Sequence, residues 1–194
     1  MDILHLFREK GALLEGHFQL SSGLHSPNYL QCALVLQFPD LAAKLGSELA
    51  QKIRKEIQPP SFVISPALGG LIIGYEVGRA LAVRFLFAER VRKSFGLRRG
   101  FQIRAGESCI VVEDVITTGG STQEVLDLIT SKGAIPSAVG CVVDRSGGKA
   151  SFQFRNQPLP LISLARLDIP THAPESCPLC KTGSAAVKPG SRPT

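Results

Sequence analysis

Cys109-Ile-Val-Val-Glu-Asp-Val-Ile-Thr-Thr-Gly-Gly-Ser-Thr122 is the segment that decides the fold class of this chain. Its β-branched run, residues 110–112, predicts a strand covered on both faces, as in a parallel α/β sheet. A polar turn follows at residues 117–120, and a helix is expected to begin near Ser121. We therefore expect a buried strand, a short turn and a helix in direct succession.

The turn combines groups that suit a phosphorylated sugar. Gly119 and Gly120 allow bare backbone to approach a ligand, and the first N–H groups of the following helix attract anions such as phosphate. Glu113 and Asp114 stand beside this cradle, where they would repel a phosphate but can accept hydrogen bonds from ribose hydroxyls. The turn has no Lys and no GxxxxGK pattern, so a nucleoside-triphosphate P-loop does not fit. The alternative is an ordinary strand–turn–helix junction, since glycine-rich turns of this kind are common.

Length and composition are those of an ordinary globular protein. The 194 residues suffice for one domain with a small appendage, and 44% hydrophobic against 20% charged residues is not the balance of a disordered chain. No apolar run reaches membrane-spanning length. The N-terminal sequence MDILHLFREKG lacks the apolar core of a signal peptide. We therefore expect a cytoplasmic protein without a membrane partner.

The net charge of +6 first suggests a nucleic-acid binder, but its distribution argues against one. Much of the excess lies in one segment, residues 89–104, which holds six bases and one acid. Neither a basic helix nor an aromatic stacking platform accompanies it, and the chain has no Trp and only two Tyr. We expect no nucleic-acid partner.

The five cysteines fall into two groups and one isolated residue, Cys32. Cys109 and Cys141 lie in apolar runs and are expected to act as small core residues. Cys177-Pro-Leu-Cys180 has the spacing of half a zinc site, but no second pair accompanies it and the nearest His in the sequence is His172. A partial or shared metal site, a redox pair and two unpaired thiols all stay open.

The remaining pattern alternates strands with helices, which predicts a parallel sheet with right-handed crossovers. Asp40 is expected to cap the second helix, and a hairpin is expected to turn around Gly96. Residues 13–38 are expected to be irregular or strand-like, and residues 183–194 loosely held. The expected helices are 2–12, 41–57, 71–81 and 121–132, and the expected strands are 62–65, 84–90, 98–103, 109–114, 138–144 and 159–164. Ligands of such sheets bind outside the carboxyl ends of the strands.

The hydrophobic strand, two acids, two further residues and a Thr/Gly/Ser turn resemble the phosphoribosyl-diphosphate signature of the type I phosphoribosyltransferases. This resemblance implies a parallel central sheet flanked by helices, a small N-terminal hood and a projecting hairpin loop. It also implies that the turn Ser65–Gly70 is a pyrophosphate-binding loop, although a tight strand-to-helix connection explains these residues equally well. The implied donor-binding residues are Glu113, Asp114, Val115, Ile116, Thr117, Thr118, Gly119, Gly120, Ser121, Ala67 and Gly69.

The segment Gly16-His-Phe-Gln-Leu-Ser-Ser-Gly-Leu-His-Ser-Pro-Asn-Tyr29 is similar to the hood of the orotate phosphoribosyltransferases, which purine phosphoribosyltransferases lack. The resemblance covers roughly residues 1–168. It implies that Thr117 and Arg145 bind orotate, because a guanidinium can grip a carboxylate in two parallel hydrogen bonds. The alternative is that Arg145 pairs with Asp144 or another surface acid.

The basic hairpin resembles the mobile catalytic loop of the same family. The resemblance implies that Arg90 and Lys93 are catalytic together with Glu113 and Asp114, since cations closing over pyrophosphate would stabilise its developing charge. The alternative is a solvated surface hairpin. Three side chains common in the family are absent: this chain has Ser21 and Leu68-Gly69 where many members have Lys and Tyr-Lys, and no His between residues 26 and 171. We interpret the chain as a member of a divergent bacterial-type branch, in which Arg98 or Arg99 can also supply the positive charge.

The resemblance implies an orotate phosphoribosyltransferase, a pentosyltransferase of pyrimidine synthesis. It implies direct displacement at C1 through an oxocarbenium-like transition state, with Mg²⁺ held mainly by substrate rather than by protein, and a homodimer. The expected division is a hood at residues 1–38, a catalytic core at 39–168 and a tail at 169–194. Two alternatives are a purine-type phosphoribosyltransferase and a regulator that senses phosphoribosyl diphosphate without turnover.

Overall fold

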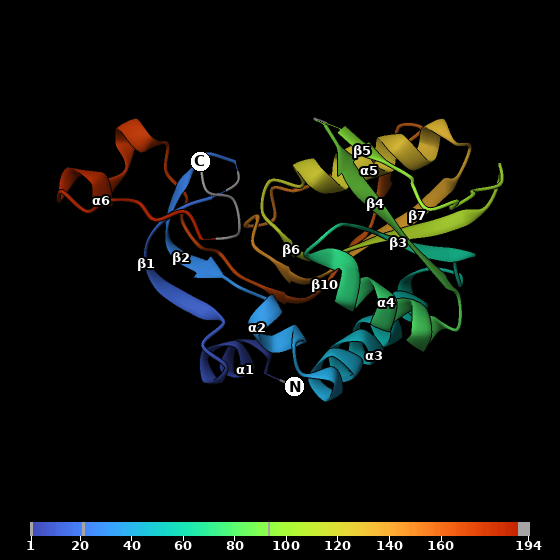
Figure 1. Cartoon of the computed structure of the whole chain (residues 1–194), viewed down its shortest axis with the longest axis horizontal. Coiled ribbons are helices and arrows are strands. Elements are labelled where there is room, and N and C mark those ends of the chain that lie inside the picture. Colours follow the sequence, from blue (N-terminus) through green and yellow to red (C-terminus); the bar gives the residue numbers. More distant parts are fainter. Residues whose placement is uncertain (1, 21, 93, 190–194) are drawn as a thin grey trace. The chain divides into compact units, whose positions relative to one another are not determined.

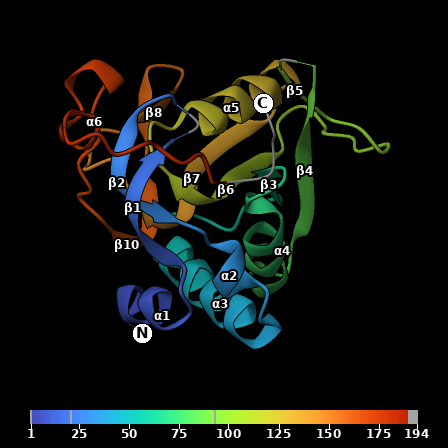
Figure 2. The same ribbon diagram turned by 60° about the vertical axis from the view of Figure 1, so that its left-hand side comes forward.

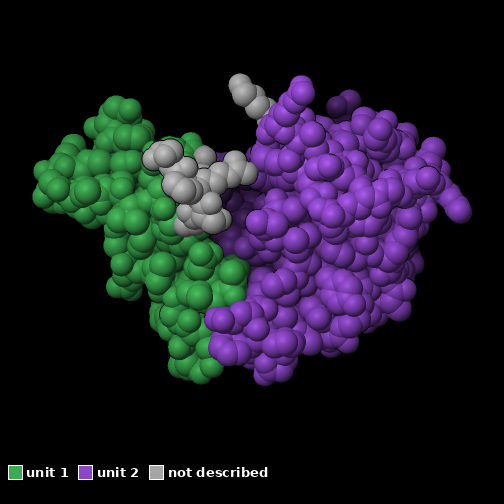
Figure 3. Space-filling model, viewed as in Figure 1, with its two compact units in different colours: residues 1–35, 168–194 green, residues 36–167 purple. Residues whose placement is uncertain are grey.

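The computed structural model describes residues 2–20, 22–92 and 94–189 (Figure 1). The chain divides into two compact units, residues 1–35 with 168–194 and residues 36–167 (Figure 3). The larger unit contains the segment Cys109–Thr122 and all the residues expected to bind substrate. Among the described residues, no helix has both the length and the apolar character that crossing a membrane requires.

A six-stranded sheet forms the centre of the larger unit. Its strands, in spatial order, are β10 (Leu161–Arg166), β7 (Ile135–Asp144), β6 (Ser108–Ile116), β3 (Phe62–Pro66), β4 (Arg84–Val91) and β5 (Ser94–Gly96). The first five strands run parallel, and β5 is antiparallel to β4. Residues 109–112 of β6 are fully buried, as their β-branched run predicts. The expected parallel central sheet is confirmed.

Helices cover both faces of this sheet. Figures 1 and 2 show α3 (Pro39–Glu56) and α4 (Gly70–Leu81) on one face and α5 (Gly120–Ser131) on the other. The apolar side of α3 is buried at four-residue spacing, at Leu45, Leu49 and Ile53. The sheet is therefore covered by helices on both faces, which explains why its central strands are apolar throughout.

The order of the strands positions the site. From β3 the chain passes through α4 to β4, whereas from β6 it passes through α5 to β7, in the opposite direction along the sheet. The two paths diverge between β3 and β6, where the helices that follow leave on opposite faces. Ligands in open α/β sheets bind at such a switch point, outside the carboxyl ends of the strands. The loops after Pro66 and Ile116 meet at this point.

The smaller unit combines the two ends of the chain. Helix α1 (Ile3–Glu9) is capped by the carboxylate of Asp2, and β1 (Leu13–Gln19) pairs antiparallel with β2 (His25–Leu30). A short helix, α2 (Ala33–Leu36), leads out of the unit. The C-terminal segment adds a 3₁₀ turn, η1 (Pro174–Ser176), and one helical turn, α6 (Pro178–Lys181). Two isolated bridges, His25 with His172 and Phe18 with Val187, join it to the hairpin.

Two expected boundaries were wrong. Pro39 takes the first position of α3 and Phe38 precedes it, so Asp40 lies in the first turn instead of capping the helix. Proline is favoured at that position because its missing N–H has no intrahelical partner there, and an acid in the first turn complements the helix dipole. Near the C-terminus, Val187 forms main-chain hydrogen bonds with His17 and Gln19, so this part of the tail is held in place.

The expected hairpin around Gly96 turns earlier than its sequence suggests. Strand β5 ends at Gly96, residues 98–103 are not a strand, and the chain turns directly after Val91, with Arg92 at φ +62°. Phe95 is buried in the core beneath α5, which requires the chain to return immediately after the turn. Lys93 lies outside the described residues.

A second hairpin falls in a segment that was expected to be a loop. Strand β8 (Phe152–Phe154) pairs with β9 (Gln157–Leu159). The two residues between them, Arg155 and Asn156, both have positive φ. That is the backbone of a two-residue turn whose twist matches the flanking strands.

Helices α3 and α4 pack at a glycine, which leads to a stability prediction. A Cβ added to Gly46 would lie 2.5 Å from Cβ and 2.8 Å from the carbonyl carbon of Glu76, so the helices would have to separate. Overpacking costs about 1–3 kcal/mol, against about 1 kcal/mol gained from the higher helix propensity of Ala. Because backbone atoms are involved, we expect the cost to prevail, so that Gly46→Ala lowers the free energy of unfolding, measured in urea, by up to about 2 kcal/mol.

The matched control is Gly96→Ala, because its added Cβ would meet only Val91 Cγ2, at 3.5 Å. We expect its urea midpoint to stay close to that of the unchanged chain. Equal midpoints for Gly46→Ala and Gly96→Ala would contradict the close contact between the two helices.

Candidate active site

The two acids at the end of β6 are half-buried, and one of them has a partner within α5. Thr122 Oγ1 donates to Glu113 Oε2 at 2.5 Å, and the Thr122 side chain is fully buried. Burial raises the pKa of Glu113 to about 7; the Thr122 hydrogen bond opposes this rise, and the neighbouring Asp114 adds to it. Glu113 therefore titrates near neutral pH.

Asp114 lies against the loop that follows β3. A Cβ on Gly69 would be 2.8 Å from Asp114 Oδ1 and 3.0 Å from Oδ2, so only glycine allows this approach. The loop is tied to β4 by a hydrogen bond from Ala67 N to Ala88 O, 2.8 Å long, and its Ala67–Leu68 peptide bond is cis. Burial raises the pKa of Asp114, while the backbone N–H groups of Val115 and Asp114 oppose the rise. The structure thus brings the predicted pyrophosphate loop and the acid pair together.

The turn between β6 and α5 has the backbone geometry of an anion cradle. Gly119 has φ +80°, and an added Cβ there would lie 2.8 Å from Phe152 Cζ. The first backbone hydrogen bond of the helix runs from Gln123 N to Gly119 O, at 2.8 Å. The N–H groups of residues 120–122 therefore precede the helical ladder and are available to an anion. Thr117 is half-buried at the start of this turn, and Thr118 and Gly120 are exposed.

Arg145 lies beside the start of the same turn. Its backbone N donates to Ile116 O at 2.8 Å, and Ile116 is in register with Asp144 on the adjacent strand. Thr117 and Arg145 are therefore the next residues along two neighbouring parallel strands. Only 4% of Arg145 is exposed. The Asp144 carboxylate accepts hydrogen bonds from the backbone and hydroxyl of Ser146, at 2.9 and 2.7 Å.

Two cations of the predicted catalytic hairpin form ion pairs within the larger unit. Arg90 donates from both terminal nitrogens to Glu124 of α5, at 3.0 and 2.9 Å, and its guanidinium lies 4.4 Å from the centre of the Phe95 ring. Arg99 pairs in the same bidentate way with Glu89, at 3.0 and 2.8 Å, which lowers the pKa of Glu89. Arg90 thus lies on the flank of the helix whose N-terminus forms the cradle.

Most of the predicted site residues converge on the carboxyl ends of β3, β6 and β7. Lys93 and the hood residue Ser21 lie outside the described residues. Sequence reasoning did not assign three residues that shape the site: Thr122, which binds Glu113; Glu124, which binds Arg90; and Phe152, which packs on Gly119. The Thr122 hydroxyl in the first helical turn was the one local signal, since it can reach back to the preceding strand.

Comparison with known proteins identifies the family of this site. The family model described as phosphoribosyl transferase domain matches residues 36–151. The orotate phosphoribosyltransferase of Carboxydothermus hydrogenoformans is 52% identical over 192 residues, which cover 99% of this chain and 98% of the relative. That of Thermotoga maritima is 48% identical over 190 residues, which cover 98% of each chain.

Solved structures agree with this assignment. The orotate phosphoribosyltransferase of Aeropyrum pernix superposes with a TM-score of 0.68 at 25% identity, covering 84% of this chain and 92% of that one. An adenine phosphoribosyltransferase from Thermoanaerobacter pseudethanolicus has a TM-score of 0.59 at 15% identity, covering 72% of this chain and 88% of that one, and shows the fold alone. Enzymes that use different bases therefore share this fold, so the fold alone does not identify the family. The two full-length relatives do, since both are orotate phosphoribosyltransferases. The chain belongs to the orotate phosphoribosyltransferase family.

Proposed function

We propose that this chain transfers the phosphoribosyl group of 5-phospho-α-D-ribose 1-diphosphate to orotate, giving orotidine 5′-phosphate and pyrophosphate in pyrimidine synthesis. The observation that carries the proposal is the meeting of an anion cradle, an acid pair and an arginine at one switch point. A phosphorylated sugar needs the first two, and a base bearing a carboxylate needs the third.

The donor is proposed to lie across the carboxyl ends of β3 and β6. Its 5-phosphate would accept hydrogen bonds from the N–H groups and hydroxyls of residues 117–121. Glu113 and Asp114 would accept hydrogen bonds from the ribose hydroxyls. Because Gly69 faces Asp114, the pyrophosphate at C1 would lie along the loop that contains Ala67 and Gly69. This arrangement gives a role to each predicted donor-binding residue except Val115 and Ile116.

Orotate is proposed to bind between Thr117 and Arg145. A buried guanidinium has lost much of its hydration, so a planar carboxylate that accepts two parallel hydrogen bonds is a well-matched partner. The carboxylate distinguishes orotate from uracil and from purines. Base selection in this proposal therefore depends on the charge of Arg145.

In the reaction, the C1–oxygen bond breaks and its electron pair leaves with pyrophosphate, while a ring nitrogen of orotate forms the new bond to C1 and releases its proton to solvent. Positive charge builds on the ribose ring and negative charge on the leaving group. Arg90 and Lys93 of the hairpin would stabilise the leaving group once water is excluded. Mg²⁺ bound mainly by substrate would add charge neutralisation, and the carboxylates of Glu113 and Asp114 suit it as oxygen ligands that act through water or ribose hydroxyls.

The proposal includes a homodimer in the cytoplasm, built from a hood at residues 1–38, a core at 39–168 and a tail at 169–194. Ile72 and Tyr75, one turn apart on α4, are 45% and 57% exposed, and a second copy of the chain could cover them. None of the five cysteines forms a disulfide, which is typical of a reducing compartment.

Arg145→Ala tests the base assignment. We expect the unchanged enzyme to release pyrophosphate with orotate but not with uracil or purines. In the variant, the KM for orotate should rise by about 30-fold or more, because a charged partner is left unpaired, while the KM for the donor stays within about threefold. Steady-state assays of pyrophosphate release measure both constants. Arg8→Ala is the control, since Arg8 is an exposed arginine of α1 to which no substrate contact is assigned.

The KM values of Arg145→Ala for orotate and for the donor distinguish a base-binding role of Arg145 from a structural one. Equal weakening of both substrates would assign Arg145 a structural role, and an unchanged KM for orotate would place the carboxylate elsewhere. Turnover of a purine by the unchanged enzyme would favour the purine-type alternative.

The raised pKa of Glu113 predicts how stability depends on pH. The folded protein holds this proton up to about pH 7, whereas the unfolded chain releases it near the ordinary value of 4.5. Between these values the folded state binds more protons, so the free energy of unfolding falls as pH rises, by up to about 3 kcal/mol. Glu113→Gln should remove this part of the slope, measured by urea unfolding from pH 4.5 to 8. The exposed Glu56→Gln should keep the slope, and a slope retained in Glu113→Gln would refute the assignment.

The hairpin cations are proposed to act in the transition state. Replacing Arg90, Lys93, Arg98 and Arg99 together with Gln should lower kcat by about 100-fold or more, with a modest change in donor KM. The control replaces two exposed cations of α3, Lys44→Gln and Lys55→Gln, and should leave kcat unchanged. A normal kcat in the quadruple variant would identify the hairpin as a charged surface feature only.

Mixing that variant with an Asp114→Asn, Arg145→Ala chain tests whether the hairpin acts across the proposed dimer. Hybrid dimers would then contain one site with both intact halves, so some activity should return. Absence of recovery in mixtures shown to exchange subunits would mean that each hairpin serves its own chain.

A further inference from the structure

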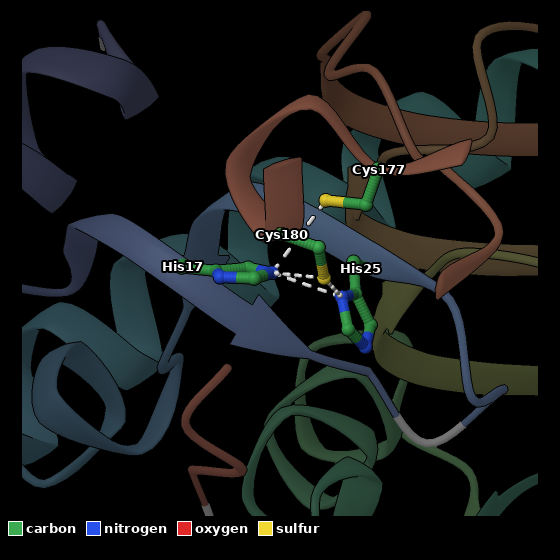
Figure 4. A group of neighbouring side chains, drawn as sticks. All are labelled: His17, His25, Cys177 and Cys180. Carbon is green, nitrogen blue, oxygen red and sulfur yellow. Dashed lines mark hydrogen bonds between the residues drawn. The ribbon is translucent and has the colours of Figure 1, made fainter. Parts of the chain in front are cut away.

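Four side chains of the smaller unit converge on one point outside the transferase site. His17 comes from β1, His25 from β2, Cys177 from the residue before α6, and Cys180 from α6 itself (Figure 4). Each offers one ligating atom, and all four atoms lie within 4.8 Å of one another. Two imidazole nitrogens and two sulfurs form a donor set typical of a structural zinc site.

Four of the six distances between these atoms can be compared with the ligand spacing around a tetrahedral metal ion, and no two of the atoms are farther apart than 4.8 Å. His17 Nε2 lies 2.9 Å from His25 Nδ1, 3.5 Å from Cys177 Sγ and 3.8 Å from Cys180 Sγ. Cys180 Sγ lies 3.3 Å from His25 Nδ1. Ligands placed 2.0–2.3 Å from a tetrahedral Zn²⁺ are about 3.3–3.8 Å apart. Only the His17–His25 pair is closer, and a small rotation of one ring would open it.

The surroundings of His17 orient its ring as a ligand. Its other ring nitrogen, Nδ1, lies 2.9 Å from the backbone carbonyl oxygen of Ser184. Donation from Nδ1 to this oxygen fixes the tautomer in which Nε2 carries a lone pair directed at the cluster. A ligating histidine commonly donates its second N–H to a carbonyl in this way.

The burial of the cluster also favours a metal. His17 and His25 are only 6% and 7% exposed, and Cys177 is fully buried. Among the described residues 168–189, Cys177 alone is buried, so this segment has almost no apolar core of its own. Segments that cannot bury enough apolar surface are commonly held by a disulfide or a metal.

We propose that His17, His25, Cys177 and Cys180 bind one structural Zn²⁺ ion, which fastens the C-terminal segment to the β1–β2 hairpin. Binding replaces the two thiol protons, which pass to solvent. With all four positions filled by protein, the ion has no open position for a substrate and takes no part in the transfer reaction. Soft sulfur together with nitrogen disfavours Mg²⁺ and Ca²⁺, which prefer oxygen.

The CxxC spacing also suits a redox pair, but the histidines argue against that role. A disulfide between Cys177 and Cys180 would use both sulfurs and leave two buried imidazoles facing each other across 2.9 Å. Zinc gives all four groups a partner at once. The metal therefore accounts for more of the cluster than a disulfide does.

Metal content tests the proposal directly. The full chain, expressed in zinc-containing medium and purified without a polyhistidine tag, should carry about one zinc per chain by elemental analysis. Cys177→Ser with Cys180→Ser should lose this zinc. Two control variants should keep the metal, because each changes a residue of the same unit that lies outside the cluster. Cys32→Ala removes a buried cysteine, and His172→Gln removes a half-buried histidine. Zinc at the same low level in the unchanged chain and in the double variant would overturn the proposal.

Two further measurements can be made on the unchanged chain, and their results on that chain do not depend on how the variants fold. Co²⁺ introduced in place of zinc should give the visible bands of a tetrahedral ion and the near-ultraviolet bands of thiolate ligation. With excess Mg²⁺ present, a zinc-selective chelator should lower the Tm of the unchanged chain and leave that of the double variant unaltered. A cobalt spectrum without thiolate bands, or a Tm insensitive to the chelator, would refute the site whatever the transferase activity.

Discussion

The close approach of Gly69 to the Asp114 carboxylate is the contact on which the site depends. It brings the loop after β3 within reach of the strand that carries the acids, and a side chain of any size at Gly69 would separate the two. The sheet makes this approach possible, because β3 and β6 are neighbours whose following helices leave on opposite faces. The acids proposed to bind the sugar and the loop proposed to bind pyrophosphate can therefore face each other without any long insertion.

The same arrangement creates an electrostatic problem, since two acids lie beside a cradle suited to phosphate. Burial raises the pKa of both Glu113 and Asp114, and that of Glu113 reaches about 7. Partial protonation lowers the negative charge that an approaching donor meets. Thr122 holds Glu113 in place through a hydrogen bond in which the hydroxyl donates. The proposed ribose hydroxyls would make the same kind of contact.

Features that neighbouring residues determine could be predicted from the sequence, whereas features that depend on contacts between distant residues could not. The strand, turn and helix of residues 109–131 are local, and their periodicity and glycines predicted them correctly. The hairpin turn was misplaced because burial of Phe95 under α5 is a tertiary contact that outweighs the local preference of Gly96 for a turn. The partners of Cys177 were missed for a stronger reason. His17 lies 160 residues from Cys177 in the sequence, and only folding brings the two together. The sequence alone therefore indicated the nearer His172.

The ion pairs of the hairpin are compatible with its proposed movement over the leaving group. Arg90 and Glu124 are 33% and 42% exposed, and exposed pairs of this kind contribute only about 0–1 kcal/mol. A pyrophosphate carries more charge than a single carboxylate, and it is met in a site from which water has been excluded, so it competes strongly for the same guanidinium. In the proposed arrangement the pyrophosphate lies along the loop of Ala67 and Gly69, and Ala67 N is hydrogen-bonded to Ala88 O, two residues before Arg90 in the chain. We therefore infer that Arg90 can leave its pair with Glu124 at little cost, as its proposed role in the transition state requires.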